Sequence, residues 1–222
     1  MLPARLKTLL LFLSLSPLLF AQKENGSWAP TFDDEFNGAE LDLSRWVPHD
    51  PRAPSHAPEA VTVNGGQLHL AGSGVVSTFG IFSQTYGRFE IRCRVPAGRG
   101  FRPRFQLLPV PLGLLPRIEV FETTGSAPSK VSFANRWGSE QTERSFGDSF
   151  TGPDLSAGFH TLSIEWDRDK ITWFIDGKEK FQSVDGVPRQ PMYLLIGLAA
   201  GSPDESESFD IDYIRVYAST TK

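Results

Sequence analysis

The sequence predicts an all-β protein in which two antiparallel sheets pack face to face as a sandwich. Apolar and polar residues alternate with a period of two along most of the chain, which is the pattern of strands with one buried face. No segment carries a capped apolar stripe with the 3.6-residue period of a helix. Short strand-like segments are separated by clusters of Gly, Pro, Asn and Asp, a spacing that is typical of antiparallel sandwiches.

The first 21 residues predict a secretory signal peptide. Arg5 and Lys7 give a short positive region, residues 9–20 are mostly apolar, and Ala21 offers a small residue for cleavage. The apolar run is shorter than the roughly 18 residues that a membrane span requires. An uncleaved membrane anchor is the alternative. We therefore expect a secreted or periplasmic protein that has no membrane contact once the signal is removed.

Residues 22–222 are expected to form one domain, and we expect it to be a monomer. Without Arg5 and Lys7, 20 of the 22 basic residues remain against 26 acidic ones, a formal charge of −6, which argues against a nucleic-acid partner. The single cysteine, Cys93, excludes an internal disulfide and is expected to be a small buried residue. The four histidines lack ligand spacing, so no catalytic transition metal is expected.

Individual strands follow from the same alternation. Apolar residues alternate with Arg and Glu over residues 88–95, and residues 162–166 and 171–175 repeat the pattern. The Asp-Gly pair at 176–177 predicts a hairpin turn, because Gly tolerates the positive φ of a tight turn. Residues 193–198 are continuously apolar, as expected for a strand that is covered on both faces.

The last predicted strand covers residues 209–216 and is expected to alternate without interruption. Phe209, Ile211, Tyr213 and Arg215 would then share one face. The Pro-rich segments 48–58 and 109–116 are predicted to be loops, because Pro donates no hydrogen bond to a sheet. The chain contains no repeat and no internal domain boundary.

Five segments, taken in their order along the chain, together point to a known protein family. They read FDDEFNG at 32–38, YGRFEIR at 86–92, FHTLSIEW at 159–166, ITWFIDG at 171–177 and DYIRVY at 212–217. Together they resemble glycoside hydrolase family 16, the laminarinase and lichenase type, over essentially all of residues 22–222. The resemblance implies a concanavalin-like jelly-roll sandwich with a cleft for a polysaccharide. It also implies hydrolysis of O-glycosidic bonds in β-glucans or related polysaccharides.

The resemblance places the catalytic strand at residues 117–122, which read RIEVFE. The family motif is Glu-x-Asp-x-x-Glu, because a nucleophile and a general acid must flank one glycosidic bond about 5–5.5 Å apart. A β-bulge brings both carboxylates to one face of the strand. By this match Glu122 falls on the acid/base, Glu119 on the central Asp and Arg117 on the nucleophile.

Arg117 is the decisive departure from the family pattern. A guanidinium stays protonated and cannot attack an anomeric carbon, so we expect hydrolysis to be impaired or absent. If Arg117 points at Glu122, the two form an ion pair in which Glu122 is no proton donor. Two alternatives stay open. Glu119 could be recruited beside Glu122 in an active retaining endo-glycosidase or transglycosylase, or all three residues could form an ion-pair network in a disused cleft.

Further substrate contacts follow from the same resemblance. Two family Trp positions are Arg102 and Gln106 here, and a family His is replaced by Arg136. Trp137 is a candidate sugar platform, with an ordinary core aromatic as the alternative. Arg102, Arg117 and Arg136 would line one cleft, and Arg binds carboxylate or sulfate through paired donors. The expected ligand is therefore a β-glucan or an anionic glycan.

The resemblance also implies a structural calcium on the convex side. Glu35, Gly66 and Asp212 fall on the positions that hold it through backbone oxygens and one carboxylate. No cofactor is required for the expected chemistry. Three functions remain open at this point: a glycan-binding protein that does not cleave its ligand, an active glycosidase, and a structural sandwich without a glycan ligand.

Overall fold

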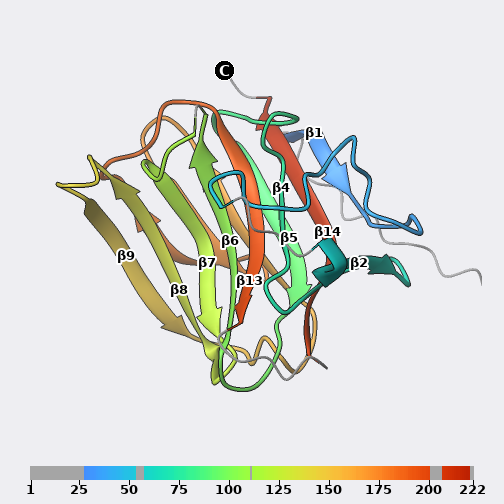
Figure 1. Ribbon diagram of the computed structural model, residues 1–222. Coiled ribbons are helices and arrows are strands. Elements are labelled where there is room, and N and C mark those ends of the chain that lie inside the picture. The colour runs from blue at the N-terminus through green and yellow to red at the C-terminus, as the bar shows by residue number, and fades with distance from the viewer. Residues whose placement is uncertain (1–27, 54–57, 111, 201–206, 221–222) are drawn as a thin grey trace, which may run out of the picture.

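The computed structural model describes residues 28–53, 58–110, 112–200 and 207–220 (Figure 1). Within these ranges the chain forms fourteen strands and one three-residue 3₁₀ helix, η1 (Pro58–Ala60). The prediction of an all-β protein is therefore confirmed. In the same ranges, no helix combines the length and the apolar character needed to cross a membrane. The predicted signal peptide lies outside the described residues.

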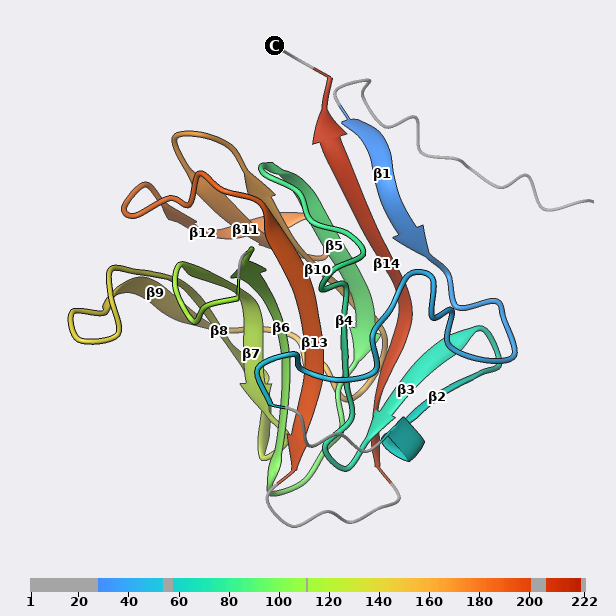
Figure 2. The same cartoon turned by 45° about the horizontal axis from the view of Figure 1, so that its top comes forward.

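The strands form two antiparallel sheets that pack against each other as a sandwich (Figure 2). The order in the first sheet is β12-β11-β10-β5-β14-β3-β2, and β1 also pairs with β14. Its strands are β1 (Trp28–Asp34), β2 (Val61–Asn64), β3 (Gln67–Ala71), β5 (Gly87–Arg94), β10 (His160–Trp166), β11 (Ile171–Ile175), β12 (Lys178–Ser183) and β14 (Ser208–Ser219).

The second sheet has the order β4-β13-β6-β7-β8-β9. Its strands are β4 (Val75–Ser77), β6 (Phe101–Pro109), β7 (Arg117–Thr124), β8 (Ala127–Trp137), β9 (Arg144–Thr151) and β13 (Met192–Ala200). Neighbours such as β13 and β6 are far apart in sequence, so the chain crosses between the sheets repeatedly. This arrangement confirms the predicted two-sheet jelly-roll sandwich.

The core lies between the two sheets and is filled largely by aromatic and branched side chains. Phe89, Trp166 and Trp173 are almost completely buried there. The indole nitrogen of Trp173, on β11, donates a hydrogen bond to the backbone oxygen of Glu119 on β7, over 2.9 Å. The core thus fixes the position of β7, the strand that carries the candidate catalytic residues.

The structure corrects the prediction for the last strand. Asp212 is an extra residue in β14, because Ile211 lies opposite Cys93 while Tyr213 lies opposite the next residue on β5. This bulge reverses the alternation, so Ile214 and Val216 join Phe209 and Ile211 in the core. The uninterrupted alternation over residues 209–216 was wrong, since a bulge shifts every later side chain to the other face.

Candidate functional site

A cavity of about 540 Å³ lies on the face of the six-stranded sheet that points away from the core. We call it the groove. Strands β6, β7 and β8 supply its floor, and the loops that precede η1 and β7 supply its sides. The lining residues are mostly charged: Asp50, Arg52, Arg104, Gln106, Leu114, Arg117, Glu119, Glu122 and Arg136.

The β-bulge expected between the two glutamates is present in β7. Glu119 lies opposite Gln106 and Glu122 lies opposite Arg104, so three steps on β7 correspond to two on β6. Val120 and the following Phe both point into the core. Glu119 and Glu122 therefore face the groove together, although a regular strand would have turned one of them inward.

Arg117 lies in the groove and pairs with Glu119. Its Nε donates to Glu119 Oε1 over 3.2 Å, and Arg136 Nε donates to the same oxygen over 2.8 Å. Arg136 also donates to Glu143 Oε1 over 2.9 Å. The hydrogen bond to Glu119 is the main reason that the pKa of Arg136 is raised above its ordinary value. Glu119, only 5% exposed, is thus held between two cations.

Arg117 does not point at Glu122, so the condition set for an Arg117–Glu122 ion pair is not met. Arg117 and Glu119 are two residues apart in the regular part of β7, so they share a face at short range. Glu122 lies beyond the bulge, and its partner is Arg102, with 3.7 Å between Nη1 and Oε1. The Arg102 side chain is 65% exposed, and such surface pairs contribute little to stability. Arg102 therefore lies at the rim of the groove rather than in its lining.

Three charged groove residues, and the apolar Leu114, were missed from the sequence. Asp50 and Arg52 lie in the Pro-rich loop and form a bidentate pair. Arg52 Nε donates to Asp50 Oδ1 over 2.9 Å, and Arg52 Nη2 donates to Asp50 Oδ2 over 2.7 Å. Burial tends to raise the pKa of Asp50, but hydrogen bonds from Arg52 hold it below its ordinary value. Arg104 points into the groove beside Gln106. The period of two along β6 could have revealed Arg104, since residues 102, 104 and 106 share one face.

Residues 27–215 match the family model described as glycosyl hydrolases family 16. That match covers most of the chain. The chain belongs to glycosyl hydrolase family 16. The fold resemblance inferred from the sequence segments is thereby confirmed, and the family is one of glycan endo-hydrolases.

Two curated relatives are named as an endo-glycanase and an endo-glucosidase. Endo-1,3-1,4-beta-glycanase ExsH of Rhizobium meliloti is 29% identical over 85% of this chain and 51% of its own length. Glucan endo-1,3-beta-glucosidase A1 of Niallia circulans is 25% identical over 84% of this chain and 37% of its own. The chain thus spans about half, or less, of the length of these relatives.

Two solved laminarinase structures match this chain over nearly their whole length. The laminarinase from Rhodothermus marinus has a TM-score of 0.74 and 25% identity, over 86% of this chain and 98% of that one. The endo-1,3-beta-glucanase (laminarinase) catalytic domain from Thermotoga petrophila also has a TM-score of 0.74, at 24% identity, over 87% and 98%. At 24% identity, the likeness to the Thermotoga petrophila domain shows a shared fold and nothing more.

Trp137 does not join the groove residues. Arg136 faces the groove, and adjacent side chains in a strand point to opposite faces, so Trp137 faces the other way. A Cβ added to Gly186 would come within 2.0 Å of Trp137 Cδ2, so the ring lies directly against that loop. A sugar-platform role has no support on the groove face, and packing against the loop explains this residue.

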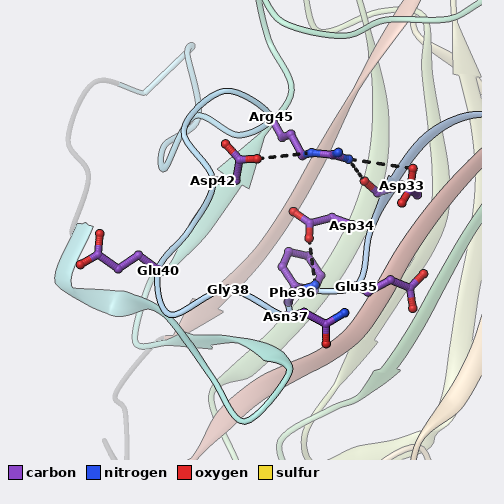
Figure 3. Close-up of a pocket in the computed structure, with 9 residues that line it drawn as sticks. All are labelled: Asp33, Asp34, Glu35, Phe36, Asn37, Gly38, Glu40, Asp42 and Arg45. Carbon is purple, nitrogen blue, oxygen red and sulfur yellow. Dashed lines mark hydrogen bonds and ion pairs between the residues drawn. The ribbon is translucent and has the colours of Figure 1, made fainter.

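The calcium ligands implied by the family 16 resemblance are engaged elsewhere. Glu35 forms two hydrogen bonds with Arg215, over 2.7 and 3.0 Å, and Asp212 pairs with Arg92. Figure 3 shows Glu35 in the acidic turn that follows β1, where Arg45 links Asp33 and Asp42.

Across the described ranges, no group of three or more His, Cys, Asp or Glu is arranged to hold a metal ion. One carboxylate was expected among the calcium ligands, but the side chains of Glu35 and Asp212 both already have arginine partners, so neither fits that role. The calcium prediction then rests on backbone oxygens alone, including that of Gly66.

Proposed function

We propose that this family 16 domain binds a polysaccharide in the groove and does not cleave it by double displacement. The observation that carries the proposal is the position of Arg117, which lines the groove and pairs with Glu119. Double displacement needs a carboxylate that attacks the anomeric carbon. A guanidinium at that place has no lone pair to offer, and it remains charged throughout the accessible pH range.

The substrate class follows from the relatives and from the family. The relatives are named as an endo-1,3-1,4-beta-glycanase and a glucan endo-1,3-beta-glucosidase, and we propose a β-glucan or a related polysaccharide as the ligand of this chain. By the family resemblance Glu122 falls on the acid/base, and its side chain lines the groove. Without a nucleophile beside it, Glu122 would contribute a hydrogen bond to a bound sugar rather than a proton to a leaving group.

The experiment is a reducing-sugar assay on laminarin, lichenan, agar and alginate. We expect no release by the unmodified protein and binding without cleavage in a gel-retardation assay. The substitution Arg117→Glu should create measurable hydrolysis of the bound polymer, because it supplies the missing carboxylate. Adding Glu122→Gln to that variant should remove the new activity and serves as its control. Hydrolysis by the unmodified protein would contradict the proposal.

One observation favours a second candidate, an active retaining glycosidase that uses Glu119 and Glu122. The bulge places both carboxylates on the groove face. Against it, Glu119 accepts hydrogen bonds from Arg117 and Arg136, which fix its position and lower the electron density available for attack. If the unmodified protein hydrolyses a glucan, Glu119→Gln should abolish that activity; survival of activity would exclude Glu119 as the nucleophile.

We also propose that the domain acts outside the cytoplasm as a monomer with no required cofactor. The positive and apolar segments of residues 1–21 support export, and a polymeric glycan is encountered there. N-terminal sequencing of the exported protein should begin at Gln22. Size-exclusion chromatography with light scattering should return the mass of one chain; a dimer mass would contradict the monomer.

A further inference from the structure

Arg104 differs from the other arginines of the groove. Arg52 pairs with Asp50, and Arg117 and Arg136 both pair with Glu119. Arg104 lines the same cavity and is half-buried, yet it forms no hydrogen bond or ion pair with any residue in the described ranges. Within the described residues, Arg104 is therefore a groove cation that has charged neighbours, Asp50 and Glu122, but no hydrogen-bonded or ion-paired partner.

This arrangement is energetically unfavourable for the protein alone. Burial lowers the pKa of Arg104, an effect that the charges of Asp50 and Glu122 partly oppose. A charged group that loses water without gaining a hydrogen-bonded partner costs free energy. Residues that are unfavourable for stability in this way are common in binding sites, where a ligand supplies the missing contacts.

The charges around Arg104 leave the groove with an excess of positive charge. The lining holds four arginines, which are Arg52, Arg104, Arg117 and Arg136, against three carboxylates. Two of those carboxylates, on Asp50 and Glu119, accept hydrogen bonds of 2.7–3.2 Å from the other three arginines. The third, on Glu122, is within ion-pair distance of the exposed Arg102. Among the four lining arginines of the described groove, Arg104 is thus the one that forms no hydrogen bond or ion pair with a carboxylate.

Gln106 extends this donor set along β6. It is two residues from Arg104 on the same face, lines the groove, and is 7% exposed. Its side-chain amide makes no hydrogen bond to any part of the chain that the structure describes. The spacing of about 6.5–7 Å between such residues lets one guanidinium and one amide contact the same sugar unit.

We propose that Arg104 and Gln106 bind the anionic substituent of an acidic sugar unit, a carboxylate or a sulfate ester, in the glycan held by the groove. The guanidinium offers two parallel N–H donors that match either oxyanion, and the Gln106 amide offers a third. This proposal rests on the proposed glycan binding. It adds that the bound polymer carries charge, and that the charged unit lies next to Glu122, which faces Arg104 across the strands.

The test compares three oligosaccharides of equal length by isothermal titration calorimetry: an oligoalginate, a sulfated galactan and a neutral β-1,3-glucan. We expect at least one acidic oligosaccharide to bind at least about tenfold more tightly than the neutral one, because charge-assisted hydrogen bonds are gained. Arg104→Gln should weaken that binding by about 10- to 100-fold. Arg104→Lys should weaken it less, since Lys keeps the charge but loses the paired donors.

Arg102→Gln is the matched control, because Arg102 is on the same strand and face but is exposed. It should change the affinity less than about threefold. Thermal unfolding separates a binding role from a structural one: Arg104→Gln should not lower the melting temperature, because an uncompensated half-buried charge is removed. A lowered melting temperature would indicate a structural role and contradict the proposal.

The remaining outcomes are distinguishable from one another. If the neutral glucan binds as tightly as the acidic ones and Arg104→Gln leaves binding unchanged, the charged-ligand proposal fails while glycan binding stands. If no oligosaccharide binds the unmodified protein, the proposed function fails and this inference fails with it. Tighter binding of the oligoalginate alone identifies the bound oxyanion as a carboxylate, and tighter binding of the sulfated galactan alone identifies it as a sulfate.

Discussion

At the scale of single residues, Glu119 and Arg104 are two charged side chains on the same sheet face that differ in whether the protein supplies a hydrogen-bonded partner. Glu119 is nearly inaccessible to water but accepts hydrogen bonds from two guanidinium groups, so its charge is compensated inside the protein. Arg104 has no such partner in the described chain. The first arrangement is complete without a ligand, whereas the second gains contacts when an anion arrives.

Asp210 is a second buried carboxylate, and it predicts a pH dependence of stability. It is 3% exposed and accepts hydrogen bonds from Arg94 over 2.6 Å and from His69 over 2.8 Å. Burial tends to raise its pKa, but the hydrogen bonds from Ser208, Arg94 and His69 hold the pKa below the ordinary value. Its stabilisation is therefore complete above about pH 4, the usual Asp value, and is lost as the pH falls through the lower folded value.

We expect Asp210→Asn to lower the free energy of unfolding by about 1–3 kcal/mol at pH 7. The difference from the unmodified protein should narrow as the pH falls below about 4. Urea denaturation at pH 7 and pH 3 measures both values. Asp154→Asn, in an exposed turn where the carboxylate bonds only to its neighbours, is the control and should have a smaller effect. An undiminished difference at pH 3 would rule out the charge of Asp210 as the cause.

At the scale of elements, the first residue of β5 fixes how three strands meet. Gly87 has a φ of 124°, and a Cβ at this position would lie 2.1 Å from the backbone oxygen of Tyr217 on β14. Both the conformation and the contact require the absence of a side chain. Gly87 therefore permits β14 to approach β5 at the point where β10 also ends, opposite Trp166.

We expect Gly87→Ala to lower the free energy of unfolding by about 2–4 kcal/mol, because backbone atoms must move and the φ is strained. Gly158→Ala is the matched control. A Cβ there meets nothing within 4 Å, so that change should be neutral or slightly stabilising. Thermal and urea unfolding of the two variants measure the difference in stability. Equal unfolding midpoints would mean that β14 can shift away from residue 87 without a loss of stability.

The strands of this fold could largely be predicted from alternation, but the bulges could not. The hairpin at residues 176–177 and the apolar strand β13 agree with their sequence patterns. The bulge in β14 was missed, because register depends on which distant strand pairs with it. The bulge in β7 was anticipated only through the family motif. A local sequence pattern indicates which residues will be buried. It does not indicate which strand pairs with them.

The site was predictable in position but not in its contacts. The resemblance located Arg117, Glu119 and Glu122 on one strand, and the structure brings them to one groove. The ion-pair partners were not predictable, because a guanidinium has several rotamers and its choice depends on side chains from other strands. Asp50 and Arg104 were missed because neither stands at a position to which the family resemblance gives a substrate contact.

At the scale of the whole molecule, Cys93 reports on how often the sandwich opens. It lies in the core on β5, paired with His160 of β10 and Ile211 of β14, and is inaccessible to solvent. Burial raises the pKa of its thiol far above the ordinary value, and the thiolate is the reactive form. A thiol reagent can therefore reach Cys93 only when the two sheets separate or β5 detaches.

We expect a disulfide-exchange reagent at pH 8 to label the native protein far more slowly than the urea-unfolded protein, in which Cys93 should react completely. The labelling rate should rise with urea in step with the population of open molecules. Val184→Cys places a thiol at a position that is 66% exposed and should react at once in the native state. Fast labelling of Cys93 in the native protein would show local opening of β5.

The pairing of β1 with β14 also has a topological consequence. Trp28 lies opposite Ser219, so the two ends of the described fold run side by side at one end of the first sheet (Figure 1). A short peptide bridging them would close the backbone into a ring, and a new opening in an exposed turn would yield a circular permutant with the same strand pairing. The same proximity suits the domain to insertion into a loop of a host polypeptide, because entry and exit points nearly coincide.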